Sequence, residues 1–167
     1  IFEPFLESVS KFDIEDINVE MFKKLKIDKL LMSKNILKEI NTKNEVNFNS
    51  KKFSRNFINK LNLKFNLAYG RLSYSKNLFI SDNNFQCKGD LNLLEEFPLL
   101  FFDCSIYSNS KRDLLKKLNI NIKKDNKVYT LNVKGNLSIL NQKINFKEIS
   151  TNENYKASNE DLNYFKE

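Results

Sequence analysis

Few residues in this chain have the types and the spacing that catalysis requires. The sequence contains no histidine, which excludes Ser-His-Asp triads, Cys-His pairs and histidine metal ligands. Glu95 and Glu96 are adjacent, so in a strand their carboxylates would point to opposite sides, and we interpret them as a solvated turn rather than an acid–base pair. The sequence has no glycine-rich phosphate loop, metal-ligand spacing or nucleophile elbow. We therefore predict that the protein is not an enzyme and has no catalytic residues, no metal and no cofactor.

The two cysteines, Cys87 and Cys104, are the other candidates for chemistry. The strand register predicted below places them directly opposite each other. In an oxidising compartment such a pair can form a disulfide, whereas in the cytosol it would remain two buried thiols. We favour the thiols, because a cross-strand disulfide requires a specific geometry.

Four predicted strands between Lys60 and Tyr107 position these residues. Apolar and polar residues alternate along the first strand, which is typical of a half-buried strand, and its apolar positions are Leu61, Leu63, Phe65 and Leu67. The parity of the apolar positions changes after Tyr69-Gly70, and such a change requires a turn or a bulge. A two-residue turn there pairs Leu67 with Leu72 and Phe65 with Tyr74.

Two further turns, at Asp82-Asn83 and at Glu95-Glu96, set the rest of the predicted register. Of the two, the Glu-Glu turn fits its position less well, because Pro98 cannot donate to the ladder and a longer loop or a bulge would shift the pairing. The predicted pairs are Ile80 with Phe85, Leu78 with Cys87, Tyr74 with Leu91, Phe85 with Ile106, and Gly89 with Phe102.

A second β block follows a predicted helix over residues 110–118, which begins with a capping box at Ser110. In this block, Lys127 to Leu140 places Tyr129, Leu131, Val133, Gly135, Leu137 and Ile139 on one face. A turn at Asn141-Gln142 pairs Ile139 with Ile144 and Leu137 with Phe146. A second capping box, at Ser158, begins a C-terminal helix that is still running at the end of the chain.

The N-terminal part mixes short elements. Residues 1–10 predict an amphipathic turn or helix, and Phe12 and Ile14 begin an extended piece. Ser33 is the expected cap of a helix over residues 33–40, residues 45–49 predict a strand, and residues 51–59 a helical turn. We therefore divide the chain into a mixed segment 1–59, an antiparallel sheet 60–150 with one inserted helix, and a helix start 151–167. Because the chain begins at Ile1, we expect it to be a segment of a longer protein.

The predicted fold is mainly β with short helices (α+β), a curved antiparallel meander with one apolar face. This face is either a core roofed by helices or an open groove for acyl chains, in which many small contacts would let a lipid slide. Lys76 interrupts the face, and we interpret it as an edge device against aggregation rather than a headgroup contact. Leu99, Phe101 and Tyr107 make the other side of the last strand apolar, so we expect that side to be covered. The residues of the apolar face are Leu61, Leu63, Phe65, Leu67, Leu72, Tyr74, Leu78, Ile80, Phe85, Leu91, Leu93, Leu100, Phe102, Ile106, Leu137, Ile139 and Phe146.

The net charge of +7, from 28 basic and 21 acidic residues, would ordinarily suggest nucleic acid or an anionic membrane surface as a partner. Lys, Asn and Ile are all abundant and Arg is rare, so the charge reflects a general compositional bias. The sequence has no Trp, and no basic cluster is interleaved with aromatics. We expect no nucleic-acid partner.

The three glycines of the chain occur in one recurring context. A glycine on the packed face of a strand marks a bend or the close approach of another group, and repeated β units of this kind build a curled sheet or groove. The copies are Gly70-Arg71-Leu72-Ser73-Tyr74, Gly89-Asp90-Leu91-Asn92-Leu93 and Gly135-Asn136-Leu137-Ser138-Ile139.

These glycine strands, the stretch from Phe85 to Asp103 and the hairpin from Leu137 to Phe146 resemble the repeated β region of the AsmA-like proteins. That family of bacterial envelope proteins is similar in architecture to bridge-like lipid-transfer proteins. The resemblance implies lipid binding or transport, or outer-membrane assembly, with acyl chains or neighbouring β repeats as partners. It also implies a membrane anchor outside this segment and a location on the periplasmic side of the inner membrane of a Gram-negative cell. The alternative is a closed α+β structural or protein-interaction domain, with the apolar face roofed by helices.

Overall fold

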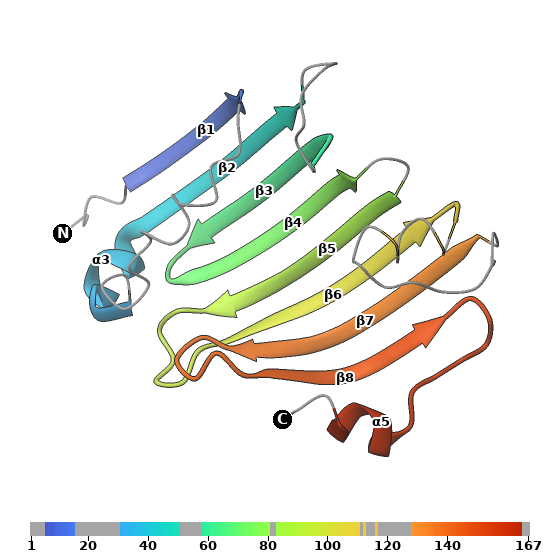
Figure 1. Ribbon diagram of the computed structural model, residues 1–167. Helices are drawn as coiled ribbons and strands as arrows, with labels where there is room; N and C mark the ends of the chain where they lie inside the picture. The colour runs from blue at the N-terminus through green and yellow to red at the C-terminus, as the bar shows by residue number, and fades with distance from the viewer. Residues whose placement is uncertain are drawn as a thin grey trace.

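In the described part of the chain, the strands form one open, mixed, eight-stranded sheet in which spatial order follows chain order from β1 to β8 (Figure 1). The computed structural model describes residues 6–15, 31–50, 58–80, 83–110, 112, 116 and 128–164. Helix α3 (Lys34–Glu39) lies next to the start of β2, and helix α5 (Asn159–Tyr164) lies beside β8. The prediction of a mainly β chain with short helices is confirmed. The strands are β1 (Leu6–Ile14), β2 (Ile40–Asn49), β3 (Lys60–Ala68), β4 (Arg71–Ile80), β5 (Asn83–Asn92), β6 (Leu99–Ser108), β7 (Tyr129–Ser138) and β8 (Ile144–Thr151).

The N-terminal edge of the sheet differs from the prediction. Residues 6–10, predicted as a turn or helix, belong to β1, which pairs in parallel with β2 from Leu6–Ile40 to Ile14–Phe48. The sheet is therefore not purely antiparallel, and its other strand pairs are antiparallel. The predicted helix after Ser33 is confirmed as α3, although the Ser33 side chain makes no capping hydrogen bond. The helical turn predicted for residues 51–59 falls mainly outside the described residues.

The turn between β3 and β4 forms as predicted, with Leu67 opposite Leu72 and Phe65 opposite Tyr74. Tyr69 and Gly70 have φ values of 50° and 78°. Positive φ at both central residues is what a two-residue type I′ hairpin turn requires, and glycine adopts it without steric penalty. The Tyr69-Gly70 sequence therefore sets this hairpin.

The predicted register between β4 and β5 is wrong by two residues. Ile80 is opposite Asn83 rather than Phe85, and β5 begins at Asn83, a residue predicted to lie in the turn. The other pairs of this ladder shift in the same way, with Leu78 opposite Phe85, Lys76 opposite Cys87 and Tyr74 opposite Gly89. A shift of two residues keeps every side chain on its own side of the sheet, because the side-chain period of a strand is two.

Between β5 and β6 the predicted pairs Phe85–Ile106 and Gly89–Phe102 are confirmed. The connection is wider than a two-residue turn, because β5 ends at Asn92 and β6 begins at Leu99. Pro98, which cannot donate to a ladder, lies just before β6 and is buried. The connection is therefore longer around Glu95-Glu96, which do not favour a tight turn, and the predicted register of the two strands is unchanged.

The last hairpin and α5 complete the described chain. Leu137 is opposite Ile144 and Gly135 opposite Phe146, so the predicted pairing is wrong by two residues, and a bulge follows between Lys134 and Gly135. The capping box at Ser158 is confirmed, since the Asp161 N–H donates to Ser158 Oγ over 3.2 Å and the Ser158 N–H donates to Asp161 Oδ2 over 2.9 Å. The helix predicted over residues 110–118 lies mainly outside the described residues, which in this range are 110, 112 and 116.

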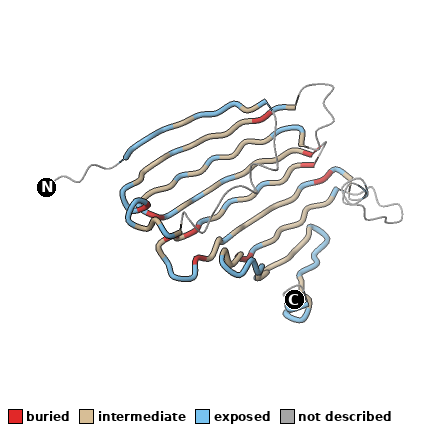
Figure 2. The backbone as a smooth tube through the Cα atoms, turned by 60° about the vertical axis from the view of Figure 1, so that its left-hand side comes forward, coloured by how far each residue is buried: buried red, intermediate tan, exposed pale blue. Residues whose placement is uncertain are grey.

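Full burial is concentrated toward the ends of the strands rather than in their middles (Figure 2). The buried apolar residues of the described chain are Leu37, Phe48, Ile80, Leu91, Leu93 and Leu162. Leu37, only 1% exposed, packs from α3 against Leu91 and Leu93. Lys34, also in α3, donates from Nζ to the carbonyl oxygens of Leu94 (3.0 Å) and Glu95 (3.2 Å), which ties the helix to the β5–β6 loop.

Candidate functional site

The side of the sheet on which Leu63 lies, here called the Leu63 side, carries most of the residues predicted for the apolar face. Residues directly opposite one another in neighbouring strands point to the same side, so the register assigns each strand residue to a side. Leu93 and Ile139 are exceptions, because they lie in the turns after β5 and β7. The residues assigned to the Leu63 side are Leu61, Leu63, Phe65, Leu67, Leu72, Tyr74, Leu78, Ile80, Phe85, Leu91, Leu100, Phe102, Ile106, Leu137 and Phe146.

Aromatic residues and glycines share one row of the Leu63 side, which we call the aromatic–glycine row, and they alternate in it from Tyr74 to Phe146. A side chain on Gly89 would collide with the Phe101 carbonyl oxygen, and its Cβ would lie 2.8 Å from Cε1 of Tyr74. At Gly135 the same position is 2.7 Å from Cζ of Phe102, whose ring meets that of Phe146 edge-on with centroids 6.3 Å apart. Each glycine thus gives room to the ring opposite it. From β3 to β8 the row contains Phe65, Tyr74, Gly89, Phe102, Gly135 and Phe146.

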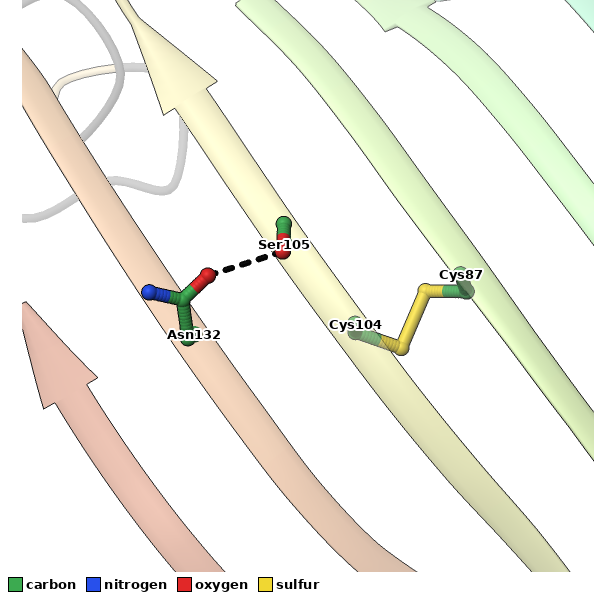
Figure 3. Close-up of a disulfide and its surroundings, with 4 residues drawn as sticks. All are labelled: Cys87, Cys104, Ser105 and Asn132. Carbon is green, nitrogen blue, oxygen red and sulfur yellow. Dashed lines mark hydrogen bonds between the residues drawn. A yellow bond between two sulfur atoms is a disulfide. The ribbon is translucent and has the colours of Figure 1, made fainter.

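A disulfide joins Cys87 and Cys104 in the next row (Figure 3). The two cysteines are opposite each other, as predicted, and their Cα atoms are 4.1 Å apart. The interpretation as two buried thiols is therefore wrong. Beside the bridge, the Ser105 hydroxyl donates to Asn132 Oδ1 over 2.8 Å, on the other side of the sheet (Figure 3).

The side of the sheet opposite the Leu63 side carries charged and amide residues in matched cross-strand positions. Asn62 donates from Nδ2 to Glu45 (2.9 Å) and to Asn47 (2.6 Å). The hydrogen bond from Asn62 and the charge of Lys64 hold the pKa of Glu45 below its ordinary value. Ion pairs on a surface contribute little stability, but they show which side chains face water. They join Lys64 to Glu45 (4.0 Å), Lys88 to Asp103 (4.0 Å) and Lys134 to Glu148 (3.7 Å).

Two expectations about single positions are wrong. Lys76 is not an edge device, because β4 lies between β3 and β5 and Lys76 is opposite Leu63 and Cys87 in the interior of the sheet. Phe101 and Tyr107 are not covered, since 38% and 45% of their surfaces are exposed. The Lys147 ammonium lies 5.1 Å from the centroid of the Phe101 ring, and this cation–π contact partly shields the ring without burying it. Glu95 and Glu96 are exposed in the β5–β6 loop, in agreement with a solvated turn.

The two edges of the sheet are unlike. Along β8, Lys156 forms an antiparallel bridge with Ser150, and the N–H groups of Thr151 and Ala157 donate to Tyr155 and Ile149 carbonyls over 2.9 Å. Among the described residues, no segment pairs with the outer edge of β1, where Val9 is 83% exposed. The β1 edge therefore presents backbone groups to which another strand can pair.

Comparison of the chain with protein-family models, with curated proteins and with solved structures gives no match. Within the described ranges, no helix has the length and apolar character needed to cross a bilayer. The same ranges contain no cluster of three or more Cys, Asp and Glu side chains that could hold a metal ion.

Proposed function

We propose that the Leu63 side is an apolar groove that binds lipid acyl chains, and that the chain is a non-enzymatic segment of an AsmA-like envelope protein. Its role would be phospholipid binding or transport, or outer-membrane assembly. One observation carries the proposal. The cross-strand register from β3 to β8 assigns Leu, Ile, Phe and Tyr side chains to the Leu63 side, and nearly all charged strand residues to the other side.

Partial exposure of these side chains supports a binding surface over a closed core. Leu61, Leu63, Phe65 and Leu78 are each only half-buried, although they lie within interior strands. Contiguous apolar surface that keeps contact with solvent is typical of interaction sites. An acyl chain laid on it would gain roughly 0.8 kcal/mol for each buried methylene. Such contacts are not directional, so the chain can slide along the sheet.

The edge of β1 and the disulfide fit the same proposal. A neighbouring β repeat of the same protein can pair with the outer edge of β1 and continue the sheet. Disulfides persist in oxidising compartments such as the bacterial periplasm, and this is the location that we propose.

A photo-crosslinking amino acid at single positions tests the proposal. Leu63 and Leu78 are the test positions. The matched controls on the opposite side are Lys64, the next residue in β3, and Gln86, which lies in β5 opposite Asn77. Leu91 also lies on the Leu63 side, but it is not a suitable test position because only 7% of its surface is exposed. On irradiation with phospholipid vesicles, we expect lipid adducts at Leu63 and Leu78 well above those at Lys64 and Gln86. Equal labelling on the two sides would refute the groove.

A closed α+β structural or protein-interaction domain is the second candidate. The contacts of Leu37 with Leu91 and Leu93, joined by Leu67 and Leu72, favour it, because here a helix covers the sheet. In that case Leu63 and Leu78 would give no lipid adducts, and hydrogen exchange on adding lipid would not change.

A further inference from the structure

Lys76 is the one charged side chain among the described strand residues of the Leu63 side. Its cross-strand neighbours are Leu63 and Cys87, and Tyr74 and Leu78 flank it along β4 on the same side. Lys76 is half-buried, and no ion pair joins it to another described residue. By contrast, Lys64, Lys88 and Lys134, all on the opposite side, each pair with a carboxylate.

An unpaired ammonium group among apolar side chains is unfavourable unless an anion accompanies it. Removing a charge from water carries a free-energy penalty that a hydrogen-bonded counter-charge offsets. Lysine is also poorly suited to a purely lipophilic surface, where leucine or methionine would fill the same volume without that penalty. The position of Lys76 therefore indicates a ligand that has both an apolar chain and a negative charge.

We propose that Lys76 binds the anionic headgroup of an amphiphile, a carboxylate or a phosphate, whose acyl chain lies along the Leu63 side. This inference rests on the proposed function and names the class of lipid. From β4 to β8 the sheet spans four strand spacings, roughly 19 Å, which is comparable with the length of an extended oleoyl chain. The aromatic–glycine row runs along this span, beside the row of Lys76.

Binding of oleate and of methyl oleate to the oxidised chain tests the inference, because the two ligands share one chain and differ in charge. The Lys76→Met variant removes the ammonium group at similar length, and Lys76→Arg keeps the charge. Lys60→Met is the matched control, since Lys60 is exposed on the opposite side of the neighbouring strand. Far-UV circular dichroism and urea unfolding verify that each variant is folded.

We expect wild type, Lys76→Arg and Lys60→Met to bind oleate roughly tenfold more tightly than methyl oleate, as one charge-assisted hydrogen bond predicts. In Lys76→Met that preference should disappear, with methyl oleate binding unchanged. If both ligands bind wild type and Lys76→Met with the same preference, the role of Lys76 is refuted while the groove stands. If wild type binds neither ligand, the groove itself is refuted, and the inference with it.

Discussion

Replacing Gly89 by alanine tests the close packing of the aromatic–glycine row. In an ordinary strand position this change stabilises a protein by about 0.5–1 kcal/mol, because alanine loses less conformational freedom on folding. At Gly89, however, the new methyl group meets the Phe101 carbonyl oxygen, which belongs to the backbone of β6, as well as the Tyr74 ring. The ring can rotate away, but the carbonyl moves only if β6 moves.

Such overpacking destabilises by about 1–3 kcal/mol, so after the backbone gain we expect Gly89→Ala to lower the free energy of unfolding by about 1–2 kcal/mol. Urea unfolding followed by circular dichroism, with the disulfide intact, measures the difference. Asp90→Ala is the matched control, because Asp90 is the next residue, is exposed and points to the other side. Its effect should stay within about 0.5 kcal/mol. A Gly89→Ala variant as stable as wild type, or more stable, would refute the proposed packing of β5 against β6.

Two other features give predictions that need only equilibrium measurements. The Cys87–Cys104 bridge closes a loop with a sequence separation of 17, so replacing both cysteines by alanine should lower the free energy of unfolding by about 3 kcal/mol. Urea unfolding of wild type with and without a reductant checks this, and identical midpoints would contradict it. Hydrogen bonds from the Ser158 backbone and hydroxyl, and from Tyr155, lower the pKa of Asp161. The stabilisation from the α5 cap is therefore fully present above the unfolded-state pKa of this carboxyl, and it is lost as the pH falls through the lower, folded-state pKa. An NMR titration of the Asp161 carboxylate, also followed through the chemical shift of the Ser158 N–H that donates to it, should show this lowered pKa. In the control variant Asp161→Asn, the Ser158 shift should no longer follow the titration. A pKa at or above the ordinary value would contradict the cap.

The alternation of apolar and polar residues was the most reliable signal in the sequence. It identified β3, β4, β5, β6 and β7, because in these strands most side chains of one side are apolar, with Lys76 as the charged exception. The Tyr69-Gly70 turn was predictable for a local reason, since a glycine with positive φ suits a tight hairpin. The opposition of Cys87 and Cys104 followed from the same parity argument.

The pairing register between strands was less predictable than the side of the sheet to which each side chain points. The β4–β5 prediction missed by two residues, because the cluster from Ser81 to Asn84 offers several polar positions for a turn, and composition does not select among them. The error left every side chain on its predicted side. It hid the contact of Tyr74 with Gly89, however, and with it the reason for a glycine in that context.

The N-terminal strand could not be found from local pattern. Leu6 and Val9 are spaced as in a helix, yet both lie in β1, whose parallel partner β2 begins at Ile40. A parallel pair joins segments that are distant in sequence, so no adjacent turn marks it. Here tertiary pairing outweighed the local periodicity. The sequence pattern also did not predict the bulge between Lys134 and Gly135. Because of this bulge, Ile149 rather than Glu148 is opposite Val133.

The described sheet is held together by contacts on both of its sides and at one end of its strands. The disulfide links β5 to β6 on the Leu63 side, the charge pairs lie on the opposite side, and the packed leucines around Leu37 lie at one end of the strands. In a closed core the central side chains would be the most buried, because they supply most of the hydrophobic stabilisation. Here Leu63 and Phe65 are less buried than Phe48 and Ile80, which lie at strand ends. Under the function that we propose, an acyl chain would lie on these half-buried central rows, and its binding would leave the disulfide, the charge pairs and the leucines around Leu37 in place.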